Sequence, residues 1–147
     1  MKLLIVTTDC KPPERLAGRL KPRIDPYLDQ YTHIAIVDKD IEVPPEFYKL
    51  PEGYPDADII GVNVGPSFRR HRLWEPTYRI RLSPRVRGGA VIYSASFIKR
   101  VGGWPPVITP DSWLLQRAKL AVKSDITVTH YQQLSPRHSI KIQISRW

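Results

Sequence analysis

Two carboxylates stand one residue apart at the end of an apolar run. Asp38 and Asp40 follow the segment Ile34-Ala35-Ile36-Val37. If the strand continues through them, side chains at alternate positions project to the same face, so these carboxylates would converge. Mg²⁺ and Mn²⁺ commonly bind one or two carboxylates and take their other ligands from water and phosphate. The pair therefore predicts a divalent cation site, although turns at strand ends also favour Asp.

The elements that would position this pair begin at the N-terminus. Lys2 to Thr8 is a short apolar run that predicts a buried parallel strand. Apolar residues at three- and four-residue steps between Leu16 and Tyr31 predict a helix, which Pro22 and Pro26 should divide. His33 to Val37 returns to strand. We therefore expect a right-handed βαβ unit with its two strands parallel and adjacent.

Later segments continue the alternation of strands and short helices. The clearest helix should begin with Thr109 as N-cap and Pro110 in its first turn, and should run to about Val122. The other expected elements are a helical turn at 44–48, strands at 58–64, 90–93 and 126–130, and a short helix at 96–101 stopped by Gly102-Gly103. The pattern predicts an α/β protein.

Composition limits the kind of protein. The chain has 147 residues, enough for one domain with a substantial core, and a formal charge of +9 that should attract phosphate groups. Cys10 is the only cysteine, so no internal disulfide forms. No apolar run reaches the length of about 20 residues that a membrane span needs. We expect a cytoplasmic protein, which could also bind peripherally to the inner face of a membrane.

Four segments of the chain resemble parts of a known family, in the same order. They are HIAIVDKDIEVPPEF (33–47), RGGAVIYSASFIKRVGGW (87–104), PDSWLLQR (110–117) and ITVTH (126–130). Together they resemble the family 2 glycosyltransferases. The resemblance implies a single-domain, GT-A-like (Rossmann-like) α/β/α sandwich with a mainly parallel central sheet. Residues 1–66 would form an abbreviated nucleotide-binding half, and residues 67–147 an acceptor-side half with a basic tail.

The resemblance also implies a reaction and its residues. Asp38 and Asp40 would be the Asp-x-Asp motif that binds Mn²⁺ or Mg²⁺ and a nucleotide-diphosphate sugar, and His130 would complete the metal shell, as in some members. Asp111 aligns with the catalytic base, which would deprotonate an acceptor hydroxyl in an inverting transfer. Here Pro110 replaces the family's usual Glu before that Asp. Asp111 could instead serve only the helix start, where Asp is favoured.

Sugar and nucleotide contacts follow from the same comparison. Gly88-Gly89 and Trp104 would line the sugar and acceptor side, although turn glycines and a packed aromatic are the structural alternatives. This chain reaches its Asp-x-Asp after a single βα unit, so the nucleotide pocket must be short. Open α/β sheets bind ligands at the carboxyl ends of their strands, which makes Thr7, Thr8 and Asp9 the candidates for the base and ribose.

Arginines support a competing hypothesis. Seven lie between Arg69 and Arg87, interspersed with Trp74 and Tyr78. Such a surface suits a nucleic-acid-binding protein without catalysis. In a transferase, the same arginines could contact phosphate. With the tail from Ile140 to Trp147, they could also hold the enzyme on an anionic membrane that carries a lipid acceptor, one of several possible acceptors beside a glycan or a protein.

Overall fold

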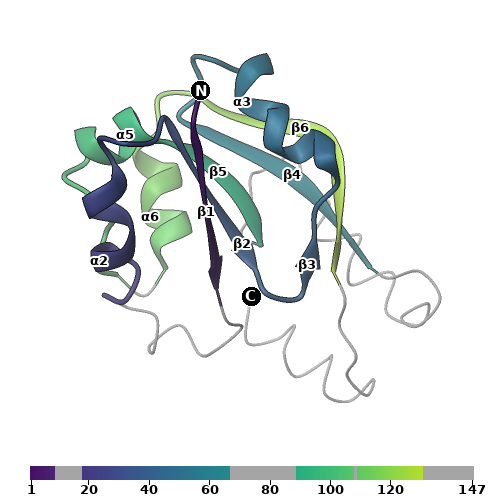
Figure 1. Ribbon diagram of the computed structural model, residues 1–147, viewed down its shortest axis with the longest axis horizontal. Coiled ribbons are helices and arrows are strands. Elements are labelled where there is room, and N and C mark those ends of the chain that lie inside the picture. The colour runs from purple at the N-terminus through teal and green to yellow at the C-terminus, as the bar shows by residue number, and fades with distance from the viewer. Residues whose placement is uncertain (9–17, 67–88, 108, 131–147) are drawn as a thin grey trace.

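One six-stranded sheet organises the chain. The computed structural model describes residues 1–8, 18–66, 89–107 and 109–130 (Figure 1). The strands lie in the order β1-β2-β5-β4-β6-β3. Their bounds are Leu3–Thr8 for β1, His33–Asp38 for β2, Ile41–Glu42 for β3, Ile59–Pro66 for β4, Ala90–Ser94 for β5 and Ala121–His130 for β6.

Short helices cover both faces of this sheet. Helices α2, α5 and α6 pack on one face, while η2 and α3 lie on the other (Figure 1). Their bounds are Lys21–Ile24 for α2, Asp25–Tyr27 for the 3-10 helix η1, Pro45–Lys49 for the 3-10 helix η2, Leu50–Gly53 for α3, Ala95–Arg100 for α5 and Pro110–Arg117 for α6. The expected α/β class is confirmed. None of the helices described is long and apolar enough to cross a membrane.

The sheet is mixed, with a dominant direction. β1 pairs parallel with β2, and β4 pairs parallel with β6. β5 runs antiparallel to both of its neighbours, β2 and β4, and β3 runs antiparallel to β6. β1, β2, β4 and β6 therefore point the same way, which agrees with the mainly parallel expectation. The parallel pairing of β1 with β2 also confirms the expected adjacency of the first two strands.

Strand alternation divides the core in two. In β2, Ile34 packs with the helix layer of α2, α5 and α6, whereas Ala35 and Val37 face the opposite layer. Phe97 and Leu114 fill the first core and have no solvent exposure. Phe47, also fully buried, fills the second. Because successive side chains of a strand point to opposite faces, the apolar run of β2 serves both cores.

The chain from Thr109 onward differs from expectation. Helix α6 ends at Arg117 instead of about Val122, and β6 begins at Ala121 instead of Ile126. Val122 pairs with Ile60 of β4. Pairing with β4 satisfies the backbone of these residues across the sheet, so long-range contacts override the local helical pattern.

A glycine pair ends α5. The backbone N–H of Gly103 donates to Ile98 O at 2.9 Å, and Gly102 N donates to Lys99 O at 3.0 Å. Gly102 and Gly103 have φ angles of +94° and +100°, a conformation that glycine adopts without steric cost. This is the helix-terminating bond pattern with a left-handed glycine after the last helical turn. The predicted stop at Gly102-Gly103 is confirmed.

Candidate functional site

The two predicted metal ligands lie at the end of a strand and on the turn that follows it. β2 ends at Asp38, Lys39 and Asp40 form a turn, and β3 begins at Ile41. The expectation that Asp38 and Asp40 share one face of an extended strand is therefore wrong. After this turn, Ile41 and Glu42 form β3, which pairs with β6 instead of extending β2. Both residues nevertheless lie at the carboxyl end of β2, Asp38 as its last residue and Asp40 on the turn.

Hydrogen bonds to Thr8 and Gly89 help to hold Asp38 and the residue after it in place. The Thr8 hydroxyl donates to Asp38 Oδ1 at 2.9 Å. The Asp38 backbone N–H donates to Gly89 O, and Lys39 N donates to Thr8 O, both at 2.8 Å. The carboxyl ends of β1 and β2 thus meet the start of β5 at this residue. In open α/β sheets this is where ligands bind.

Thr7 and Thr8, the predicted nucleotide contacts in β1, lie on opposite faces of the sheet. Thr8 is 6% exposed and alternates with Val6, which belongs to the core beneath the helices. Thr7 is exposed and lines a cleft on the other face. Asp9 lies outside the described residues. Only Thr7 of the described pair is therefore open to a ligand on the cleft side.

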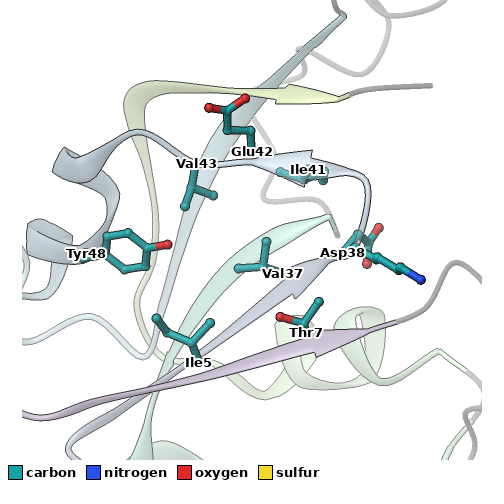
Figure 2. Close-up of a pocket in the computed structure, with 9 residues that line it drawn as sticks. Ile5, Thr7, Val37, Asp38, Ile41, Glu42, Val43 and Tyr48 are labelled. Atoms are coloured by element: carbon teal, nitrogen blue, oxygen red, sulfur yellow. The ribbon is translucent and has the colours of Figure 1, made fainter. Parts of the chain in front are cut away.

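A cleft of about 320 Å³ opens beside Asp38. Figure 2 shows Ile5, Thr7 and Val37 between Tyr48 at one end and Asp38 at the other. Its full lining is Ile5, Thr7, Val37, Asp38, Lys39, Ile41, Glu42, Val43 and Tyr48. Apolar side chains with polar groups at the two ends suit a ligand that has a flat apolar part and a charged or polar part.

Two of these lining residues, Ile5 and Tyr48, carried no signal in the sequence. Ile5 sits in the middle of an apolar strand, yet it is 48% exposed. Tyr48 follows Phe47 directly, and the 3-10 helix η2 turns Phe47 into the core and leaves Tyr48 38% exposed. The composition of either segment does not tell which side chain is covered.

The end of β6 reaches the same turn. His130 pairs with Ile41, the residue after Asp40, and also with Pro66 at the end of β4. Its side chain lies outside the described part of the structure, so only its backbone is located. The register brings the residue predicted as third metal ligand beside the predicted pair.

The carboxylates suit a cation that shares its ligands with phosphate. Among the side chains described, no group of three or more His, Cys, Asp or Glu residues is arranged to hold a metal ion. A closed protein cage is thus absent from the described residues. Asp38 and Asp40 remain a fitting set for Mg²⁺ or Mn²⁺, because such ions at phosphate sites often use only one or two carboxylates.

Gly89 is required by its surroundings. Its φ is +117°, and a Cβ atom at this position would lie 3.0 Å from Ile41 Cδ1. A larger residue would strain the backbone and push against β3. The glycine thus permits the close approach of β5 and β3 around the Asp38 turn. Gly88 lies outside the described residues.

Asp111 is the second residue of α6 and is exposed. The C-terminal side of α6 is tied to the start of β4, because Asp58 N donates to Leu120 O at 2.8 Å. Since β4 runs in the direction of β1 and β2, the start of α6 lies toward the carboxyl ends of those strands (Figure 1). Thr109 precedes the helix as predicted, but its side chain makes no capping hydrogen bond.

The neighbourhood of Asp111 includes Tyr93 of β5. Burial raises the pKa of the Tyr93 hydroxyl, and the negative charge of Asp111 raises it further. Tyr93 is 2% exposed and belongs to the core on the helix side of the sheet. Asp111 therefore lies on the face of the sheet that α2, α5 and α6 cover, the face to which Thr8 also points.

Trp104 is a core residue. It is 3% exposed, and its ring meets that of Tyr93 edge to face, with centroids 5.3 Å apart. Its backbone N–H donates to Asp25 Oδ1 at 2.8 Å. Of its two interpretations, packing and sugar stacking, this burial favours packing, because a stacked sugar needs an exposed ring face.

The remaining predicted surfaces lie outside the described residues. These are the seven arginines between Arg69 and Arg87, the aromatics Trp74 and Tyr78, and the tail from Ile140 to Trp147. No protein-family model matches the chain, and no curated protein matches it either.

Proposed function

We propose that this protein is a metal-dependent glycosyltransferase, which moves a sugar from a nucleotide-diphosphate sugar to an acceptor hydroxyl with inversion. One observation carries the proposal. The Asp38 turn lies where the ends of β1, β2 and β6 and the start of β5 meet, beside a cleft. Segments that are far apart in the sequence and resemble one family thus come together in space.

The cleft is the proposed site of the nucleoside. Its volume of about 320 Å³ is at the lower end of the range for small-molecule sites, as expected for an abbreviated pocket. Ile5 and Val37 offer apolar surface to a planar base, and the aromatic ring of Tyr48 offers a stacking partner. The hydroxyl of Thr7 can exchange hydrogen bonds with the ribose or the base.

The diphosphate is proposed to lie over the Asp38 turn. Asp38 and Asp40 would hold the divalent cation, with His130 as a further ligand. When bound, the ion neutralises charge on the departing nucleoside diphosphate. The positive net charge of the chain favours approach of such an anionic donor.

Asp111 is the proposed general base. Asp38 lines the cleft, but its carboxylate also accepts the Thr8 hydroxyl from the face that α2, α5 and α6 cover, and Asp111 is the second residue of α6 on that same face. The start of α6, which carries Asp111, lies toward the carboxyl ends of β1 and β2, where the Asp38 turn is also found (Figure 1). A diphosphate-linked sugar held over that turn could extend toward Asp111. The Asp111 carboxylate would then accept the proton of the attacking hydroxyl.

A thermal-shift screen tests this function. Nucleoside diphosphates and their sugars are added with and without Mn²⁺, and the melting temperature of the protein is followed. A ligand at 100 times its Kd stabilises the folded state by about 2.7 kcal/mol. We expect stabilisation that needs Mn²⁺ and that Asp38→Asn and Asp40→Asn remove. No response to any donor, together with binding of DNA or RNA that falls steeply with salt, would favour the nucleic-acid hypothesis.

A further inference from the structure

Adjacent threonines at the end of β1 have different surroundings. Thr7 faces the cleft and is exposed, whereas Thr8 is 6% exposed and faces the helix side. The Thr8 hydroxyl donates to Asp38 Oδ1 at 2.9 Å across the parallel pair of β1 and β2. Because Thr8 is buried and its hydroxyl already donates to a neighbouring carboxylate, it is poorly placed to bind a base or a ribose.

We propose that Thr8 is a positioning residue for Asp38, which orients that carboxylate toward a divalent cation. This inference rests on the metal site of the proposed function. It replaces the role in nucleotide recognition that the sequence suggested for Thr8. Groups that hydrogen-bond to metal ligands fix the orientation of those ligands, and their loss typically lowers metal affinity about 10- to 100-fold.

The Thr8 hydroxyl acts on the carboxylate itself. The bonds from Asp38 N to Gly89 O and from Lys39 N to Thr8 O hold the main chain of the turn. The bond from the hydroxyl to Oδ1 restricts rotation of the carboxylate about its own axis. Removal of the hydroxyl should therefore leave the turn in place and loosen only the ligand. The backbone carbonyl of Thr8 is unchanged by any substitution of the side chain.

Thr8→Val and Thr7→Val form a matched pair for the test. Valine keeps the β-branched shape that suits a strand and lacks only the hydroxyl. Mn²⁺ binding is measured by electron paramagnetic resonance, for Mn²⁺ alone and with inorganic pyrophosphate in place of the donor diphosphate. We expect Thr8→Val to weaken Mn²⁺ binding about 10- to 100-fold. Thr7→Val should bind Mn²⁺ and pyrophosphate like the wild type, because its hydroxyl faces the cleft, where it is proposed to contact only the nucleoside, and this assay contains no nucleoside.

The outcomes separate this inference from the function on which it rests. Equal Mn²⁺ affinity in the wild type and Thr8→Val overturns the positioning role and leaves the metal site standing. Absence of Mn²⁺ binding in the wild type, with or without pyrophosphate, overturns both. If Thr8→Val fails to fold, Thr8→Ser and Thr8→Cys replace it. Serine keeps the donor and should retain binding, whereas the thiol is a weak donor and should lose it.

Discussion

Arg100 Nη2 lies 2.7 Å from Asp58 Oδ2, which joins the end of α5 to the start of β4. The same carboxylate oxygen also accepts the backbone N–H of Lys119 at 2.8 Å. The Asp58 side chain is 10% exposed and that of Arg100 40%. Asp58 thereby links the end of α5, the start of β4 and the segment after α6, at the amino end of β4 and therefore at the end of the sheet opposite the Asp38 turn.

Loss of Arg100 should destabilise the fold. Arg100→Met retains the apolar part of the side chain and removes the partner of a largely buried carboxylate, which costs about 1–3 kcal/mol. Lys99→Met is the matched control, since Lys99 pairs with Asp29, whose side chain is 89% exposed. Such surface pairs contribute about 0–1 kcal/mol. Urea unfolding measures both, and equal losses would refute the special role of Arg100.

Asp58 should also make stability depend on pH. Burial works against ionisation of Asp58, but hydrogen bonds from Arg100 and Lys119 outweigh it and lower its pKa. A lowered folded-state pKa gives stability that is present above the unfolded pKa of about 3.9 and is lost as pH falls through the folded value. Unfolding free energies of the wild type and Asp58→Asn should therefore converge in strong acid. A constant difference down to low pH would contradict this.

His33 should make the stability of the fold depend on pH in a second, higher range. Burial lowers the pKa of its imidazole, and the charge of the N-terminus lowers it further. Its Nε2 is buried and has no hydrogen-bond partner among the residues that the structure describes. The unfolded chain therefore takes up a proton first, and stability should fall as pH drops through about 6.5. Melting temperatures between pH 8 and pH 5 check this, with His33→Gln expected to flatten the slope.

The glycine pair after α5 offers a graded test. An added Cβ at Gly102 would have no atom of the described residues within 4 Å, so Gly102→Ala should cost only the strain of its positive φ, about 1–2 kcal/mol. A Cβ at Gly103 would lie 2.7 Å from Asp25 Oδ2 as well. Gly103→Ala should thus lose more, because it also displaces the acceptor of the Trp104 N–H. Equal melting temperatures of the two variants would contradict this order.

Asp111→Asn should separate chemistry from binding. Removal of a general base typically costs about 10²–10⁴-fold in rate. Donor binding with Mn²⁺, read by thermal shift, should persist because Asp111 lies away from the Asp38 turn. Ser112→Ala, at the next exposed position of α6, is the control. Full transfer activity in Asp111→Asn would remove Asp111 from the mechanism.

The sequence predicted those parts of the fold that depend on local patterns. The apolar runs of β1, β2 and β5 are found as strands, and the stop at Gly102-Gly103 is found with its left-handed backbone. The antiparallel direction of β5 depends on which strands become its neighbours, and no local pattern encodes that. For the same reason Ala121 to Asp125 was missed as strand, since pairing with β4 decides its state.

The candidate site was predictable in its residue types and less so in its geometry. Asp38 was identified at a strand end, where it lies. Alternation along an extended strand could not foresee that Asp40 lies on a turn, because the partner of the following residues is the distant β6. Because successive side chains of a strand alternate, the sequence predicts that Thr7 and Thr8 point to opposite faces of the sheet. Which of these faces is buried depends on where the helices pack.

The pairing of Ile41 with His130 also bears on how the protein folds. These residues are separated by most of the chain, and the pairing of β2 with β5 also joins distant segments. Closing such long loops costs chain entropy before any contact is gained, and non-local topologies fold slowly. The β3 side of the candidate site therefore forms only after β6 has docked, whereas the contacts of Asp38 with Thr8 and Gly89 do not depend on β6.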